Sequence, residues 1–409
     1  MSAKGSARPR LLFVSPRYLF PLDEGGKIRT ANTLRGMKGG RFEIHLAAPL
    51  PPGRRDEAEL AGICDRFVSW PAPQVSRARR LAALLDPLPI GVAADRSAAG
   101  RAVVERAFAE RPDVLVADFP HSAVLLPQAL TVPCVMFTHN VEAEIFERHA
   151  AHAKGFWQPV WRDQARKMRR FERDTLRRFT RVIAVSARDA AALREQFGLA
   201  RVDAIDTGVD LDFLAYTPPP AAPVDGGIVA FTGTMSARAN VDGVQFLMDE
   251  IWPRVLRARP KAEAAIIGRD PPESLQRAAR ERGYAWRFTG FVDDVRPHVR
   301  AAHLSVIPLR VGSGTRIKAF ESMALGRPVV STTVGVEGLA VAPGQHLLAA
   351  DDAEGFAAAV LRLLDEPALG TRLASAARAL LQERFSWSQV AAQFEAVCAA
   401  AMETPAEEG

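Results

Sequence analysis

Residues 308–331 constrain the fold of this 409-residue chain more than any other stretch. An apolar strand end is followed by a glycine-bearing turn, an amphipathic helix, a glycine stop and a second apolar strand. Gly312 and Gly314 allow a tight turn and a close approach of the backbone to a ligand. Gly326 and Pro328 then end the helix in the usual order of helix stop signals. The stretch therefore predicts one strand–turn–helix–strand unit of an α/β protein.

The start of this helix has the chemistry of an anion site. Arg316 and Lys318 lie in its first turn, where backbone N–H groups also favour phosphate. Ser313 or Thr315 can cap the helix. Glu321, one turn deeper, can accept hydrogen bonds from vicinal hydroxyls such as those of a ribose. These side chains indicate a site for a phosphate or diphosphate group that carries a sugar.

Length and composition predict a soluble globular protein with two domains. A chain of 409 residues with 48% hydrophobic and 24% charged residues exceeds what one core usually organises. The sequence has no apolar run near the roughly 18 residues of a membrane-spanning helix, and its first apolar run, residues 11–14, is too short for a signal peptide. Cys64, Cys134 and Cys398 form neither a disulfide framework nor a zinc pattern. We therefore expect a cytoplasmic protein.

The net charge of +6 favours anionic partners. Much of the excess lies in residues 162–181, within a long basic amphipathic helix expected over 156–179. Such a helix can bind anionic lipid head groups, or it can simply cover the sheet as a solvated helix. It has few interleaved aromatic residues that could stack on bases, which counts against nucleic acid.

Strands and helices alternate in both halves of the chain. The proline- and glycine-rich residues 216–227 predict the linker between the two α/β domains. We place the first domain at 8–215 and the second at 228–385. A last helix is expected at about 386–403, followed by a disordered acidic tail over 404–409.

The motif at 312–318, continued at 321–331 and 335–339, resembles the donor-binding motif of retaining glycosyltransferases of family four, which have the GT-B fold. The usual signature has two glutamates with seven residues between them. Glu321 matches the second, and Ser313 stands in place of the first, as in the Gly-Ser-Gly-Thr-Arg branch of the family. The resemblance implies two Rossmann-like domains facing each other across a cleft. The first would bind the acceptor, the second the nucleotide-sugar donor, and the last helix would return to the first domain.

The resemblance extends to the first half of the chain. Gly25 and Gly26 match a loop that approaches the donor diphosphate in relatives, although a plain strand-to-helix turn would look the same. His139 follows an apolar strand, and ligands bind outside the carboxyl ends of parallel strands. In relatives a histidine here often contacts the transferred sugar. A core-edge histidine is the alternative.

In the second half, Gly233 and Arg238 lie between a strand and a helix. In many relatives the first turn of this helix carries an arginine and a lysine. Those two positions are Thr234 and Ala239 here, so the cationic charge is expected from the later helix. The turn over residues 289–293 matches the segment that reads the nucleobase, although a simple loop would match it equally. The expected catalytic residues are His139, Arg316 and Lys318, and the expected donor-binding residues are Gly25, Gly26, Gly233, Arg238, Phe291, Val292, Gly314, Thr315, Arg316, Lys318 and Glu321.

The predicted reaction moves a sugar from a UDP- or GDP-sugar to an acceptor hydroxyl with retention of configuration. No acidic metal cluster is evident and no cofactor is expected, so cationic side chains would stabilise the departing diphosphate. The sequence indicates no nucleophile. Exopolysaccharide, lipopolysaccharide and glycolipid assembly are all open as pathways, with a glycan or lipid-linked acceptor and peripheral contact with the inner membrane. The alternatives are a catalytically silent nucleotide-sugar-binding subunit and a sugar-nucleotide epimerase.

Overall fold

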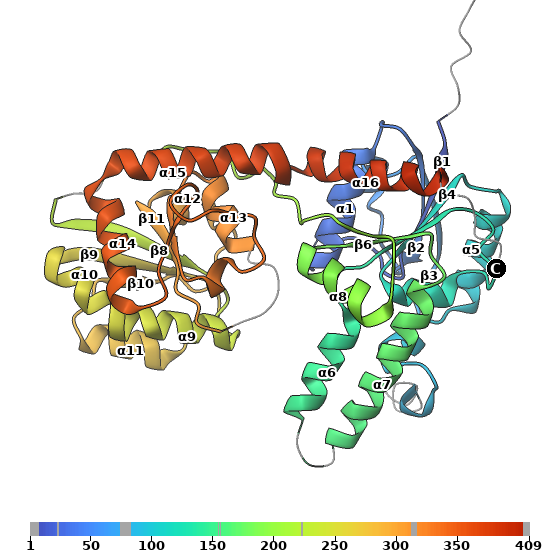
Figure 1. Cartoon of the computed structure of the whole chain (residues 1–409), viewed down its shortest axis with the longest axis horizontal. Coiled ribbons are helices and arrows are strands. Elements are labelled where there is room, and N and C mark those ends of the chain that lie inside the picture. The colour runs from blue at the N-terminus through green and yellow to red at the C-terminus, as the bar shows by residue number, and fades with distance from the viewer. Residues whose placement is uncertain are drawn as a thin grey trace, which may run out of the picture. The chain divides into compact units, whose positions relative to one another are not determined.

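The computed structural model describes residues 8–22, 24–73, 83–153, 155, 157–221, 224–311 and 317–403. The chain forms two compact units (Figure 1). Unit 1 contains the chain up to Gly208 and again from Trp387, and unit 2 runs from Val209 to Ser386. Each unit is built on one parallel sheet, which confirms the predicted pair of Rossmann-like α/β domains. The tail predicted over 404–409 lies outside the described residues.

Unit 1 is organised around seven parallel strands in the order β3-β2-β1-β4-β5-β6-β7. Strand β1 serves two cores, because successive side chains of a strand point to opposite faces of the sheet. Leu11 and Phe13 lie in one core, and Leu12 and Val14 lie in the other. The strands are β1 (Arg10–Val14), β2 (Glu43–Leu50), β3 (Arg66–Pro71), β4 (Val114–Asp118), β5 (Cys134–Phe137), β6 (Arg181–Ala184) and β7 (Val202–Ala204).

Helices cover both faces of this sheet. Helix α1 (Gly25–Met37) and the last helix α16 (Trp387–Glu403) share one core, to which α16 contributes Phe394 and Cys398. Gly36 lets the two helices touch, since a Cβ there would lie 2.6 Å from the Cβ of Ala391. The other helical segments of unit 1 are α2 (Glu57–Ala61), η1 (Ala83–Leu85), α4 (Ile90–Ala94), α5 (Ala98–Ala109), η2 (Pro120–Leu125), α6 (Glu142–His152), α7 (Trp157–Leu176) and α8 (Ala187–Phe197).

Helices α6 and α7 pack against each other and extend away from the sheet of unit 1 (Figure 1). Glu172 of α7 is fully buried and accepts the backbone N–H groups of Glu142 at 2.9 Å and Ala143 at 2.7 Å. It thereby satisfies two of the donors that the start of α6 leaves unpaired. Burial nevertheless raises the pKa of Glu172 to about 8. The start of α6 is therefore held against α7 by this buried carboxyl group.

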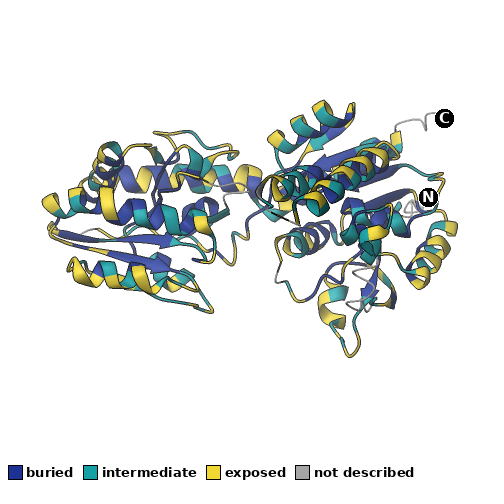
Figure 2. Cartoon of the chain, turned by 90° about the horizontal axis from the view of Figure 1, so that it is seen from below, coloured by how far each residue is buried: buried dark blue, intermediate teal, exposed yellow. Residues whose placement is uncertain are grey.

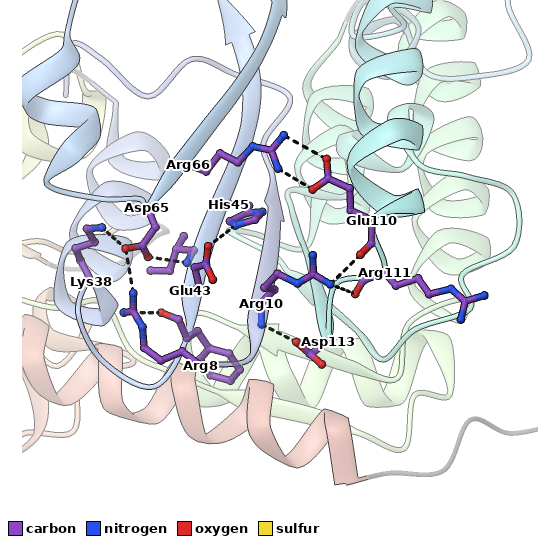
Figure 3. Close-up of polar contacts among 12 residues, drawn as sticks. Arg8, Arg10, Lys38, Glu43, His45, Asp65, Arg66, Glu110, Arg111 and Asp113 are labelled. Atoms are coloured by element: carbon purple, nitrogen blue, oxygen red, sulfur yellow. Dashed lines mark hydrogen bonds and ion pairs between the residues drawn. The ribbon is translucent and has the colours of Figure 1, made fainter. Parts of the chain in front are cut away.

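Charged side chains hold the amino ends of the first strands of unit 1 (Figure 3). Asp65 accepts hydrogen bonds from Arg8 and Lys38. Arg66, the first residue of β3, forms a two-point ion pair with Glu110 at 2.6 and 3.2 Å. These groups lie at the end of the sheet opposite to the one where parallel α/β sheets bind ligands. We therefore assign them to holding strands and helices together.

Unit 2 repeats the plan with six parallel strands in the order β10-β9-β8-β11-β12-β13. In both units the strands are largely buried and the outer faces of the helices are exposed (Figure 2). The strands are β8 (Gly226–Thr232), β9 (Lys261–Ile267), β10 (Trp286–Phe288), β11 (Leu304–Ile307), β12 (Val329–Ser331) and β13 (Leu348–Ala349).

The helix expected after the loop that contains Gly233 is interrupted by a π-helical turn. Helix α9 (Arg238–Phe246) continues through the turn η3 (Leu247–Ile251) into α10 (Trp252–Ala258). Pro253 has no N–H group and crowds the preceding turn, so a wider turn just before it is physically reasonable. The other helical segments of unit 2 are α11 (Glu273–Glu281), α12 (Arg296–Arg300), α13 (Ile317–Ala324), η4 (Val334–Val336), α14 (Ala353–Asp365), α15 (Pro367–Leu380) and η5 (Leu381–Phe385).

Arginine side chains bind the first residues of unit 2 to its body. Arg327 is fully buried and donates to the carbonyl oxygens of Thr217 at 2.5 Å and Pro218 at 2.8 Å. Arg378 donates to two further carbonyl oxygens of the same segment, at 2.9 and 3.0 Å. The division between the units falls directly after Gly208, ahead of residues 216–227, where the sequence indicated the linker.

Candidate functional site

Unit 2 carries a pocket of about 270 Å³ at the carboxyl ends of its strands. The loops after β8, β9 and β10 form its wall together with α13, at the edge where parallel α/β sheets bind ligands. Five of the predicted donor-binding residues line this pocket: Gly233, Phe291, Val292, Lys318 and Glu321. The other lining residues are Thr232, Thr234, Ile267, Gly268, Arg269 and Val295.

Two glycines allow the loops after β8 and β9 to touch. Gly233 has φ +156° and Gly268 has φ +149°, values that L side chains rarely adopt. A Cβ at Gly268 would lie 2.1 Å from the carbonyl oxygen of Gly233. A Cβ at Gly233 would lie 2.9 Å from Nζ of Lys318. Side chains larger than hydrogen would therefore push apart the loops that form the pocket.

Asn240 holds Lys318 in place. The lysine Nζ donates to Oδ1 of Asn240 at 2.6 Å and lies 4.7 Å from the ring centre of Phe231. Asn240 is buried, and its Nδ2 donates to the carbonyl oxygen of Thr234 at 2.8 Å. One neutral side chain thus fixes both the lysine and the loop after β8. Sequence analysis missed Asn240, whose position in the first turn of α9 was the available signal.

Glu321 forms part of the pocket wall one helical turn beyond Lys318. Burial raises the pKa of the Glu321 carboxyl group, and the charge of Lys318 opposes that rise. A half-buried carboxyl group beside an open pocket is suited to accept hydrogen bonds from the hydroxyls of a bound sugar.

The turn after β10 provides an apolar surface. Phe291 is 70% exposed, and Val292 packs partly against the core of unit 2. Gly290, with φ +68°, pairs with Gly268 in an isolated antiparallel bridge. This bridge ties the turn to the loop after β9. Backbone pairing therefore connects the apolar wall of the pocket to the loop that carries Gly268.

The structure does not bring every predicted donor residue to this pocket. Arg238 is the first residue of α9 and is exposed, but it is not among the lining residues. Gly314, Thr315 and Arg316 lie outside the described residues, as does Ser313. Arg269 and Asn240, by contrast, belong to the pocket region without having been predicted.

In unit 1, His139 lies in a buried polar network at the carboxyl ends of β1, β4 and β5. Its Nε2 is 2.7 Å from Oδ1 of Asp118, and its Nδ1 is 3.3 Å from Nη1 of Arg29. Asp118 also accepts the hydroxyls of Ser15 at 2.9 Å and Thr30 at 3.1 Å. The side chain of His139 is 2% exposed and that of Asp118 is 0% exposed.

These contacts define the proton position of His139. A guanidinium group can only donate, so Nδ1 accepts from Arg29 and Nε2 carries the proton that is donated to Asp118. Burial lowers the pKa of His139, overcoming the opposite effect of Asp118. Burial also lowers the pKa of Arg29 to about 10. The ring is therefore neutral at pH 7, with both nitrogens engaged inside unit 1.

Phe119 covers this histidine. The ring centres of Phe119 and His139 are 3.9 Å apart and their planes differ by 23°. The backbone of Phe119, with φ 60° and ψ 144°, is in a region that residues other than glycine rarely occupy. Gly26 packs on the same ring, since a Cβ there would lie 2.5 Å from Cζ of Phe119. At Gly25, no described atom lies within 4 Å of the equivalent Cβ.

The pocket in unit 2 has the features that a nucleoside diphosphate needs. Lys318 provides positive charge, the carboxyl group of Glu321 can accept hydrogen bonds from hydroxyl groups, and Phe291 offers an exposed apolar surface on which a base could lie. Among the described residues, no cluster of three or more His, Cys, Asp or Glu side chains is arranged to hold a metal ion. Within the same part of the chain, every helix is too short or too polar to cross a membrane.

Two family models match the chain, one in each half. The model described as Glycosyltransferase Family 4 matches residues 24–213. The model described as Glycosyl transferases group 1 matches residues 226–366, which include the loops and helix of the unit 2 pocket.

Curated relatives have names from the same class. The chain is 29% identical over 296 residues to a glycogen synthase of Mycobacterium tuberculosis, covering 69% of this chain and 67% of the relative. It is 29% identical over 210 residues to a phosphatidyl-myo-inositol mannosyltransferase of Mycolicibacterium smegmatis, covering 49% of this chain and 53% of the relative.

Solved structures share the fold over nearly the whole chain. Sucrose-phosphate synthase from Thermosynechococcus elongatus superposes with a TM-score of 0.65 at 18% identity, covering 96% of this chain and 99% of that one. HepE from Anabaena in complex with UDP superposes with a TM-score of 0.65 at 16% identity, covering 96% and 100%. The two family models, the curated relatives and the shared two-domain fold together support a glycosyltransferase of the family-four type with the GT-B fold.

Proposed function

We propose that this enzyme transfers a sugar from a UDP- or GDP-sugar to an acceptor hydroxyl, with retention of configuration and without a metal ion. The observation that carries the proposal is the unit 2 pocket, where Gly233, Lys318 and Glu321 come together beside an apolar wall. These are the groups that a diphosphate, a ribose and a base would each need.

The chemical demand of the reaction is to stabilise a departing nucleoside diphosphate. Lys318 is preorganised for this task because Asn240 holds its ammonium group before any ligand binds. We assign Arg316 and the backbone of Gly314 and Thr315 to the same diphosphate on the basis of the sequence motif. Glu321 would bind the ribose hydroxyls.

The remaining site residues are assigned to the base, the diphosphate and the sugar. Phe291 and Val292 would contact the nucleobase, and Arg238, together with the glycine pair Gly25 and Gly26, would approach the diphosphate. We assign His139 to the transferred sugar. In its present position the ring has both nitrogens engaged, so such a contact requires one of these partners to be exchanged.

Donor binding tests the proposal directly. Purified protein is titrated with UDP, GDP and a panel of their sugars without added metal, beside Glu321→Gln and the control Glu281→Gln. Glu281 is an exposed residue of α11 outside the pocket. Losing hydrogen bonds between a charged acceptor and hydroxyls should weaken donor binding in Glu321→Gln by about tenfold or more. Equal affinity of a folded Glu321→Gln protein and the wild type would remove Glu321 from the site.

A second candidate, a donor-binding subunit without transfer activity, has one observation in its favour. His139 is buried and both its ring nitrogens already have partners. Release of UDP or GDP from a bound sugar nucleotide, measured over hours and slowed in His139→Ala, supports the enzyme. A sugar nucleotide that binds tightly and stays intact, with or without candidate acceptors, supports the silent subunit. Conversion of the sugar nucleotide into an epimer would instead identify an epimerase.

We further propose a role in cell-surface polysaccharide or glycolipid assembly, including exopolysaccharide and lipopolysaccharide, at the cytoplasmic face of the inner membrane. A relative named as a phosphatidylinositol mannosyltransferase supports this direction. Several basic residues of 162–181 are engaged inside unit 1, as Arg169 is with Glu147 at 2.7 Å. The side chains of Arg166 and Arg170 are 80% and 82% exposed and are the best placed to meet a membrane.

Vesicle flotation tests the membrane contact. The wild type, an Arg166→Gln/Arg170→Gln double variant and the control Arg280→Gln are mixed with vesicles of phosphatidylglycerol and phosphatidylcholine. Each basic residue near an anionic surface contributes about 1 kcal/mol, so the double variant should bind at least about tenfold more weakly. Equal flotation of the wild type and the double variant would exclude this surface as the contact.

A further inference from the structure

Arg269 is a charged residue of the pocket that sequence analysis did not predict. It lies at the start of the loop after β9, two residues beyond the strand, and it lines the same pocket as Lys318 and Glu321. We propose that Arg269 is a direct phosphate ligand of the bound nucleotide. This inference rests on the proposed donor site and adds a further cation to it from an independent loop.

The backbone around Arg269 is held rigidly. It stands between Gly268, with φ +149°, and Asp270, with φ +58°, and two prolines follow. The carbonyl oxygen of Arg269 accepts the backbone N–H of Met235 at 2.9 Å, which ties the loops after β9 and β8 together. The backbone of Arg269 is thus in place before the ligand arrives, which lowers the ordering cost of binding.

The charge of Arg269 is available to a ligand. The residue is exposed, and within the described part of the chain its side chain forms no ion pair or hydrogen bond. Three other arginines of unit 2 show the contrast, because each is paired with an acid. These pairs are Arg282 with Asp249 at 2.5 Å, Arg296 with Asp294 at 2.8 Å and Arg310 with Asp242 at 2.7 Å. Arg269 therefore differs from these three in lining the pocket and in having no acidic partner among the described residues.

The strand order places Arg269 in the middle of the pocket. Strand β9 lies between β10, whose following turn carries Phe291, and β8, whose following loop carries Gly233 beside Lys318. A nucleotide whose base lies on Phe291 and whose diphosphate lies at Lys318 would pass the end of β9 with its ribose and first phosphate. A guanidinium group is cationic, can only donate hydrogen bonds and can give two parallel ones to phosphate oxygens. The chemistry of Arg269 therefore favours the phosphate over the ribose.

The test compares diphosphates with nucleosides. Wild type, Arg269→Gln, Arg269→Lys, Glu321→Gln and the control Arg280→Gln are titrated with UDP and GDP by calorimetry. Binding of uridine and guanosine is measured from their NMR signals, because nucleosides bind more weakly. Arg280 is exposed on α11 and lies outside the pocket, so Arg280→Gln makes the same change in net charge. Circular dichroism confirms that each variant is folded.

We expect Arg269→Gln to weaken diphosphate binding by at least about tenfold while nucleoside binding is unchanged. Arg269→Lys should recover part of the loss, and Arg280→Gln should match the wild type. Normal diphosphate binding in Arg269→Gln, together with weak binding in Glu321→Gln, would overturn the role of Arg269 and leave the proposed function standing. An equal loss of nucleoside binding would also overturn it, because Arg269 would then contact the base. A wild type that binds neither UDP nor GDP would reject both the proposed function and this inference.

Discussion

Replacing Gly268 with alanine should separate the two loops that form the corner of the pocket. The new Cβ would lie 2.1 Å from the carbonyl oxygen and 2.7 Å from the carbonyl carbon of Gly233. Contacts of this kind are usually longer than about 3.4 Å, so the loops must move apart by roughly 1 Å. Overpacking of this size costs about 1–3 kcal/mol, and the backbone strain at φ +149° adds about 1–3 kcal/mol.

Gly283→Ala provides the matched control within unit 2. Gly283 also has a positive φ, +66°, but no described atom lies within 4 Å of its Cβ position. Alanine there should cost only the backbone strain, about 1–2 kcal/mol. The extra cost of Gly268→Ala is therefore that of forcing the two loops apart. Because Lys318 is held beside Gly233, the same movement should also weaken donor binding by about tenfold or more.

Calorimetric unfolding and UDP titration measure both effects. An extra 1–3 kcal/mol corresponds to a Tm roughly 2–10 °C lower for the unit 2 transition of Gly268→Ala than for that of Gly283→Ala. The reasoning is refuted if the two variants unfold at the same temperature and bind UDP, or GDP if that is the natural nucleotide, with equal affinity. Such a result would mean that the loops after β8 and β9 accommodate a methyl group without moving.

Three further changes test other parts of the structure. Asn240→Asp would place a carboxylate where Oδ1 now lies 2.6 Å from Nζ of Lys318, and calorimetric titration should show UDP binding weaker by about tenfold or more with uridine binding unchanged. Burial raises the pKa of Glu172 from 4.5 to about 8, so between these pH values the folded state keeps a proton that the unfolded state loses. The stabilisation from this protonated carboxyl group is fully present below about pH 4.5 and is lost as the pH rises towards 8. Urea unfolding of unit 1 should therefore show the wild type losing up to about 1.4 kcal/mol per pH unit relative to Glu172→Gln across this range, and parallel pH profiles would contradict the assignment. Arg327→Leu should cost unit 2 about 3–5 kcal/mol, because buried carbonyl oxygens lose their donor, and limited proteolysis should then cut faster around residues 216–221.

Many strands of both units could be predicted because they are short apolar runs between turn residues. The fully buried strands β4, Val114–Asp118, and β11, Leu304–Ile307, are examples. The grouping of Gly233, Lys318 and Glu321 could be predicted only through the family motif, since the chain separates the first of these widely from the others. Their shared pocket follows from the sheet order, which brings the ends of β8, β9 and β10 together.

Other parts of the site depend on contacts that no local pattern reveals. Asn240 is one amide side chain among many until the fold places it against Lys318. The charge of residues 162–181 suggested a free basic surface, but Arg169 pairs with Glu147 on another helix. The proline-rich linker likewise belongs to unit 2, because Arg327 binds its carbonyl groups from a distant part of the chain. Composition alone does not reveal such long-range partners.

Helix α16 has a consequence for how the protein is made. Unit 2 is one uninterrupted stretch, whereas unit 1 needs Phe394 and Cys398 from α16 to complete its core. Domains usually fold in order of synthesis, from the N-terminus onward. Here the ribosome has already produced all of unit 2 before it adds the last helix of unit 1. We expect unit 2 to reach its final fold first, while the surface of α1 that α16 later covers is left for chaperones to shield.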